Sequence, residues 1–145
     1  MIELIFVIVL LGILAAVALP RLAASRDDAI LVKGKSQISA IRSGIVMQKS
    51  KRLLEGNNSG GSYYPATLET SQTSMLFDNG ILEYGLQDKK TDGNWNRTTD
   101  YNASTIQYNF YMSGAPTQFS YTSSDGQFTC ATSACLLYTS PSPRD

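Results

Sequence analysis

The sequence predicts an α+β protein in which one long, kinked N-terminal helix packs on a small antiparallel β-meander head. Three observations predict this: residues 4–19 are apolar and uncharged, residues 20–55 repeat apolar side chains at helical spacing, and residues 106–130 alternate apolar and polar side chains. We therefore divide the chain into an apolar half-helix (1–19), an amphipathic half-helix (20–55), a globular α+β head (56–134) and a tail (135–145).

The apolar half-helix is long enough to cross a lipid bilayer. A helix of about eighteen residues spans roughly 27 Å, which is close to the thickness of the hydrocarbon core. The run is interrupted only by Glu3. A cleaved signal peptide, a plain transmembrane anchor and a filament-forming segment are the three interpretations, and the first lacks the usual basic start. The third accounts for Glu3, because a neighbouring copy supplies a cation or amine to a carboxylate that is costly in lipid.

An amphipathic helical segment follows Pro20. Proline lacks the amide hydrogen that a helix interior needs, so we expect a kink at Pro20, and not an end. Beyond it, apolar residues recur at helical spacing: Leu22, Ala23, Ile30, Ile38, Ile41 and Ile45. The helix is predicted to end near Leu54, before a stretch rich in Gly and Asn. A coiled-coil seam is the alternative, but Gly34 and Gly44 interrupt its heptads.

The head is predicted to contain three short strands that form an antiparallel meander. Apolar and polar side chains alternate over residues 106–112, 119–121 and 128–130, and turn signals separate these segments. Residues 63–69 are predicted to form a loop, residues 74–77 and 81–84 are short apolar pieces, and residues 89–102 are polar and turn-rich around Trp95. One face of the meander is apolar, and the helix stripe is available to cover it.

The N-terminal residues resemble a known family motif. The segment Met1-Ile2-Glu3-Leu4, the apolar run and Pro20 resemble the prepilin N-terminus of type IV pilins and type II secretion pseudopilins. In that family a basic leader ends in Gly, and a methylated Phe opens the mature helix. Glu3 falls on the family's conserved glutamate, and Pro20 falls on the proline that bends its helix. The resemblance covers about the first 30 residues. It implies a pilin-like fold and a prepilin-type methylation motif that is truncated here, so that Met1 lies two residues inside the mature protein.

The resemblance also implies a function. It implies a structural subunit of a type II secretion pseudopilus or a type IV pilus-like filament. Before assembly, such a subunit is held in the inner membrane by a single pass, with its head in the periplasm; a true pilin ends in an extracellular filament. The implied partners are other copies through the N-terminal helix, related pilins or pseudopilins, the inner-membrane assembly machinery and the lipid bilayer. A pseudopilin for protein secretion and a true pilin share this N-terminus. A monomeric membrane-anchored periplasmic binding module is the alternative.

The composition argues against an enzyme. The chain has no histidine, which removes the commonest general base and a common metal ligand. We find no nucleophile–base pair and no phosphate-binding loop, and we expect no cofactor.

The charge is unevenly distributed along the chain. Residues 21–55 carry a net charge of +5 and residues 56–145 carry −4, so the two parts can attract each other between subunits. We expect no nucleic-acid partner, because the Lys and Arg residues are interleaved with apolar residues and lack aromatic neighbours.

A weak calcium candidate lies in the head, where some pseudopilins hold this ion. Its oxygen ligands would occupy alternate positions: Asp92, Asn94 and Asn96. Arg97 stands where an EF-hand has glycine, and Ala103 stands where it has its closing acid. The competing interpretation is a solvated turn with Trp95 packing inward, and it leads us to expect no metal.

Two cysteines lie near the C-terminus. Cys130 and Cys135 form a local pair, which fits an oxidising compartment better than a zinc site. Many pilin-like heads close a C-terminal loop with a disulfide, so the resemblance implies one here. Residues 135–145 resemble the translation of a sequencing-library adapter, so we expect the natural chain to depart from this sequence after Ala134 and Cys135 to be adapter-derived. A Ser/Pro-rich disordered tail is the alternative.

Overall fold

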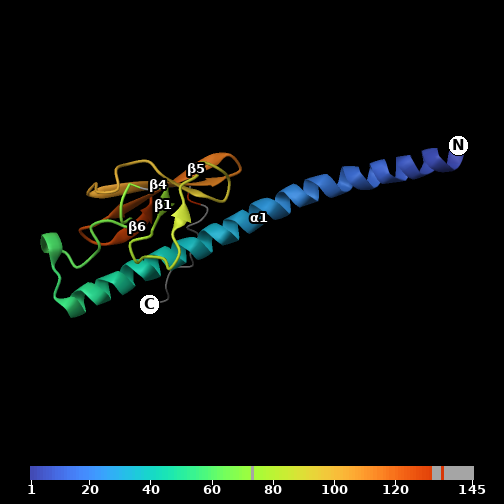
Figure 1. The fold of residues 1–145 in the computed structure, drawn as a ribbon. Helices are drawn as coiled ribbons and strands as arrows, with labels where there is room; N and C mark the ends of the chain where they lie inside the picture. The colour runs from blue at the N-terminus through green and yellow to red at the C-terminus, as the bar shows by residue number, and fades with distance from the viewer. Residues whose placement is uncertain (73, 132–134, 136–145) are drawn as a thin grey trace.

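The computed structural model is an α+β structure that describes residues 1–72, 74–131 and 135 (Figure 1). One long helix, α1 (Ile2–Glu55), comes first, and a short 3-10 helix, η1 (Ser59–Gly61), follows it. A two-stranded antiparallel sheet joins β1 (Met75–Leu76) to β2 (Leu86–Gln87). A four-stranded antiparallel sheet contains β3 (Trp95–Arg97), β4 (Thr105–Met112), β5 (Ala115–Thr122) and β6 (Gln127–Cys130) in that order. The α+β class predicted from the sequence is confirmed.

Helix α1 is a single continuous element of 54 residues, which corresponds to a length of roughly 80 Å. Helix α1 continues through Pro20, and Figure 1 shows the whole helix as gently curved. The predicted local kink at Pro20 stays a prediction. Its end is defined by Gly56, whose φ of 64° is one that glycine adopts without strain. The amide of Gly56 donates to the Leu53 carbonyl and the amide of Asn57 donates to the Arg52 carbonyl, so two carbonyls of the last turn are satisfied.

The four-stranded sheet is a simple meander built around the β4–β5 hairpin. The register of this hairpin runs from Thr105 opposite Thr122 to Met112 opposite Ala115. Its two-residue turn, Ser113-Gly114, has φ values of 52° and 76°, the positive values that match the twist of paired strands. The three-strand prediction was wrong: the two-stranded β1–β2 sheet was not predicted, and the meander has a fourth strand, because β3 also pairs with β4. This three-residue strand has one large apolar side chain, Trp95, and so gives no alternation signal.

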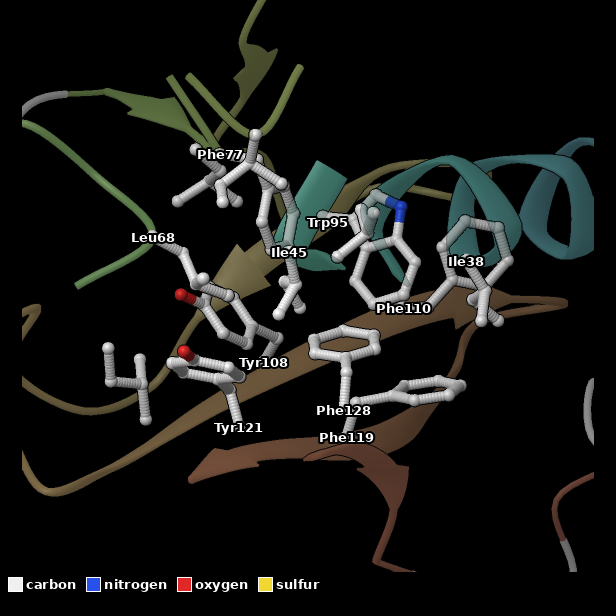
Figure 2. Packing of buried hydrophobic residues seen from close by; sticks show 14 of the residues in the cluster. Ile38, Ile45, Leu68, Phe77, Trp95, Tyr108, Phe110, Phe119, Tyr121 and Phe128 are labelled. Carbon is white, nitrogen blue, oxygen red and sulfur yellow. The ribbon is translucent and has the colours of Figure 1, made fainter. Parts of the chain in front are cut away.

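The core lies between the apolar face of the sheet and one face of α1 (Figure 2). Its sheet side combines Ile106 with six aromatic residues: Trp95, Tyr108, Phe110, Phe119, Tyr121 and Phe128. Its helix side is a stripe of isoleucines: Ile30, Ile38, Ile41 and Ile45. Strand β1 adds Leu76, and the connecting segments add Leu68, Phe77 and Ile81. The predicted stripe was wrong at Leu22, which is 67% exposed, because the head covers α1 only from Ile30 onward.

Polar contacts fix the head along the second half of α1. Near the start of the contact, Lys33 Nζ donates to the Gly93 carbonyl at 2.7 Å. Near its end, Gln48 Nε2 donates to the Gly80 carbonyl at 2.8 Å. Between them the backbone itself comes close, since a Cβ atom on Gly44 would lie only 2.0 Å from the Ile81 carbonyl oxygen. The head is therefore held against α1 by packing that leaves little room at its centre.

Candidate functional site: the exposed half of helix α1

The first half of α1 has no partner within the described chain. We call residues 1–19 the rod. Every residue of the rod is exposed, and the least exposed of its large apolar side chains, Leu10, is still 45% exposed. Figure 1 shows the rod extending away from the head. An apolar helix that is exposed on all sides needs lipid or other protein around it, because burial of apolar surface is strongly favourable.

The rod has the dimensions of a membrane span. Among the described residues, α1 is the one helix that is long and apolar enough to cross a bilayer, and this property rests on its N-terminal part. No residue in its most apolar stretch is buried inside the molecule, in contrast to the core helix of a soluble protein. The chain therefore has one helix near its N-terminus that can span a membrane.

Glu3 is the only charged side chain of the rod. It is exposed and lies in the first turn of α1, where a helix favours negative charge. The ion pairs of the described residues are Lys51–Glu55 and Arg97–Glu69, so no cation of the described chain pairs with Glu3. A carboxylate in this position is available to a cationic group outside the molecule.

Charged residues follow the rod immediately. Pro20 is exposed within α1, and Arg21, Arg26, Asp27 and Asp28 come next, all of them exposed. Since the head begins to cover α1 at Ile30, these charged residues lie between the rod and the head, in contact with solvent. They mark the limit of the surface that suits lipid.

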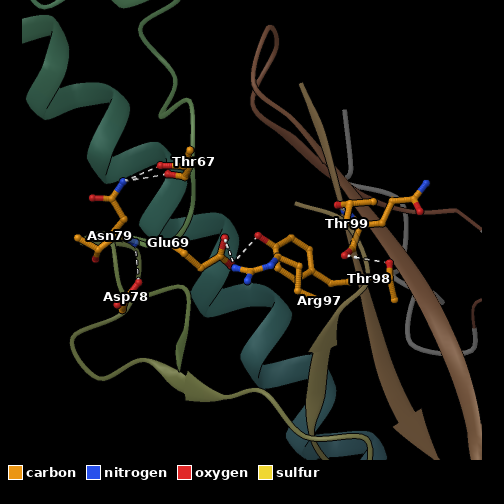
Figure 3. A network of polar contacts seen from close by, with 10 residues as sticks. Thr67, Glu69, Asp78, Asn79, Arg97, Thr98 and Thr99 are labelled. Carbon is orange, nitrogen blue, oxygen red and sulfur yellow. Dashed lines mark hydrogen bonds and ion pairs between the residues drawn. The ribbon is translucent and has the colours of Figure 1, made fainter. Parts of the chain in front are cut away.

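The head contains a buried polar network that the sequence did not reveal (Figure 3). Glu69 is fully buried, accepts a 2.7 Å hydrogen bond from Tyr108 Oη and lies 3.5 Å from Arg97 Nη1. Burial raises the pKa of Glu69, although the Tyr108 hydrogen bond and Arg97 act in the opposite direction. Burial and the Glu69 carboxylate also raise the pKa of Tyr108. The network joins the loop that contains Glu69 to strands β3 and β4.

The weak calcium candidates have separate hydrogen-bond partners. Asp92 Oδ1 accepts from the Gly114 amide, Asn94 Nδ2 donates to Thr91 Oγ1, and Asn96 donates to Asp88 Oδ1. Asn96 lies in β3, where it is buried, and its neighbour Trp95 packs into the core. In the part of the chain that the structure describes, no group of three or more His, Cys, Asp or Glu side chains is arranged to hold a metal ion.

Cys130 and Cys135 are joined by a disulfide, and both side chains lie beside the core. Cys130 ends β6, so the disulfide ties the chain back to the edge of the four-stranded sheet. The rest of the predicted adapter-like tail, residues 136–145, lies outside the described residues.

Comparison of the chain with protein-family models, with curated proteins and with solved structures gave no match in any of the three. The resemblance to pilins therefore rests on the N-terminal motif alone.

Proposed function

We propose that this protein is a structural subunit of a type II secretion pseudopilus or type IV pilus-like filament, stored in the inner membrane before assembly with its head in the periplasm. The observation that carries the proposal is the rod: an apolar helix exposed on all sides, with one carboxylate near its tip. A head that covers only the second half of α1 leaves the rod available to lipid and to other copies.

The physical basis of the proposal is that the same surface suits two surroundings. Lipid tails are as apolar as the side chains of the rod, so moving a rod from lipid into a bundle of rods changes its apolar contacts little. Close packing among rods and the pairing of Glu3 then decide whether the rod is more stable in lipid or in the bundle. Transfer from membrane to filament therefore needs no refolding of the head.

Glu3 gives this transfer a direction. An ionised carboxylate inside a bilayer costs a few kcal/mol, and this cost is offset when a cation or a free amine lies beside it. In a bundle of parallel rods, the N-terminal amine of a neighbouring copy is such a group. Glu3 then stabilises one register between copies, and copies in any other register leave the charge unpaired.

A cysteine scan of the rod tests the proposal. Single cysteines are placed at successive positions from Leu4 to Leu19 in the full chain, which is then oxidised in membranes. A filament subunit gives disulfide-linked ladders whose yield varies with helical period, because only one side of each rod faces a given neighbour. A monomeric anchored binding module gives uniformly low yields at all positions, and this result would contradict the proposal.

Glu3→Gln with Glu55→Gln as its matched control tests the role of the carboxylate. Both changes remove one exposed acid from α1 at nearly constant volume, but Glu55 lies at the far end of the helix and pairs with Lys51. We expect Glu3→Gln to lower the ladder yield roughly tenfold, since a lost pairing of about 1.4 kcal/mol has this effect on an equilibrium. Equal yields from the two variants would remove the role of Glu3.

A further inference from the structure

We propose that the head of one copy docks on the uncovered face of α1 in the next copy, so that an acidic patch with exposed apolar groups meets an uncharged helix face bordered by lysines. This inference rests on the proposed function and adds to it the surface that sets neighbouring heads. Two surfaces are involved. The stem face comprises exposed residues of α1 on the side away from the sheet: Val32, Ser36, Ser39, Ala40, Ser43, Val46, Met47, Ser50 and Leu54. The head patch comprises Met75, Asp78, Glu83 and Tyr84.

The stem face lies opposite the isoleucine stripe. At 100° per residue, its members cluster around the direction away from the stripe, and Figure 1 shows the strands gathered on the other side of α1. Four large apolar side chains of this face are well exposed: Val32 at 66%, Val46 at 58%, Met47 at 70% and Leu54 at 90%. No member of the face is charged, and every member is exposed, although Val46 at its edge lines a groove with Tyr64 and Gln127 of the head. A helix surface in permanent contact with water normally carries charges, so this face is suited to a partner.

Basic residues border the stem face. Lys35 and Lys51 are exposed on its two sides, and residues 21–55 carry a net charge of +5. A second stem with the same border would be repelled. The charge of the stem therefore favours an acidic partner.

The head patch supplies an acidic partner with exposed apolar groups. Tyr84 is 80% exposed and Met75 is 37% exposed, whereas most large apolar residues of the head are buried. These residues are neighbours, because a Cβ atom on Gly85 would lie 3.1 Å from Asp78 Cβ and 3.5 Å from Met75 Cβ. Glu83 is exposed beside Tyr84. Residues 56–135 have seven acids and three bases, so the head as a whole carries −4.

The two surfaces point in different directions within one copy. The segment that carries the head patch is anchored on α1 where Ile81 meets Gly44 and where Gln48 donates to the Gly80 carbonyl. On the helix, Gly44 and Gln48 lie roughly 100° and roughly 140° around the axis from the middle of the stem face. A contact between two unlike surfaces is heterologous, so each copy keeps one free surface of each kind and the contact repeats from copy to copy. This geometry suits a filament.

Mixed cysteine pairs test the contact. Copies that carry Met47→Cys and copies that carry Tyr84→Cys, each with its own tag, are produced together as full chains in membranes and oxidised. We expect disulfide-linked dimers that contain both tags, in roughly tenfold excess over a control pair, because docking raises the local concentration of the two thiols. The control pair combines Met47→Cys with Ala115→Cys, an exposed position at the β4–β5 turn outside the head patch.

Each outcome of this experiment either supports or overturns the proposed contact. Mixed dimers at the level of the Ala115→Cys control overturn the inference, and so do dimers formed mainly between two Met47→Cys copies, which would place stem against stem. If the rod cysteines still form periodic ladders in either case, the proposed filament function stands and only this contact fails. Mixed dimers without rod ladders support the contact and contradict a filament held together by the rods.

Charge exchange gives an independent readout. Glu83→Lys should lower the yield of mixed dimers several-fold, and combining it with Lys51→Glu in the other copy should restore the yield, as opposite charges across a contact do. Both side chains are exposed, so neither change disturbs the core. A failure of Lys51→Glu to restore the yield would show that these two surfaces do not face each other.

Discussion

The two halves of α1 belong to one continuous helix but have opposite environments. In the rod, every side chain is exposed, including sixteen consecutive residues without charge. In the second half, the isoleucine stripe is buried against aromatic rings and the opposite face is open. The second half has its core within the chain, whereas the rod has none. Stability of the head and association of the rod are therefore separate properties, and mutations can change one without the other.

The largest separation is expected from one isoleucine in each half. Ile41 is fully buried and Ile13 is 59% exposed. Ile41→Ala should lower the free energy of unfolding of the head by about 2–5 kcal/mol, because it removes core contacts and leaves a cavity. Ile13→Ala should change it by less than about 0.5 kcal/mol, as surface substitutions do.

The measurement uses the fluorescence of Trp95 during denaturant unfolding of the full chain in detergent. Trp95 is the single tryptophan of the chain and is 1% exposed in the core, so it reports on the head alone. Similar losses for both alanine variants would contradict the independence of the two halves.

A pair of glycines gives a smaller effect with the same logic. A Cβ atom on Gly44 would lie 2.0 Å from the Ile81 carbonyl oxygen, whereas nothing lies within 4 Å of one on Gly12. Gly44→Ala should therefore destabilise the head by about 1–3 kcal/mol, since helix and head must separate to accept the methyl group. Gly12→Ala should leave head unfolding unchanged and favour helix in the rod by up to about 1 kcal/mol.

Circular dichroism separates these two effects, because it reports helix content while Trp95 reports the head. If Gly44→Ala matched the parent protein in denaturant unfolding, the close approach of α1 to Ile81 would be wrong.

The sequence predicted the elements whose pattern is long and regular. The 54-residue helix and the β4–β5 hairpin follow from apolar runs and alternation, and both are present. Strand β3 was missed because three residues are too few to show a period. Gly44 was interpreted as an interruption of a heptad pattern, but its lack of a side chain is what admits Ile81.

The candidate site was also predictable from the sequence only in part. The exposure of the rod was predictable, since an unbroken apolar helix has no polar face to turn toward water. The Glu69 network was not, because its acid lies in an irregular loop and its partners, Arg97 and Tyr108, lie far along the chain. The stem face was not predicted, because its serines are mixed with scattered apolar residues. That these side chains share one side of α1 becomes clear only once the buried side of the helix is known.

The smallest expected effect concerns one acid in the rod, Glu3, and one acid in the head, Glu69. Burial raises the pKa of Glu69 above its ordinary value of 4.5. Between pH 4.5 and the raised pKa, the folded head holds a proton that the unfolded chain releases. The contribution of Glu69 to stability is thus fully present below pH 4.5 and is lost as the pH rises through the folded-state pKa.

Trp95-monitored unfolding of the parent protein, Glu69→Gln and Glu3→Gln between pH 4.5 and pH 7 tests this sign. The amide that Glu69→Gln introduces cannot titrate, so the free energy of unfolding of the parent minus that of this variant should grow as the pH falls. Glu3→Gln serves as the control, because it also removes an acid and Glu3 makes no ion pair with the head in the described structure. A Glu69→Gln difference that shrinks on acidification would show that Arg97 and Tyr108 stabilise the carboxylate more than burial destabilises it.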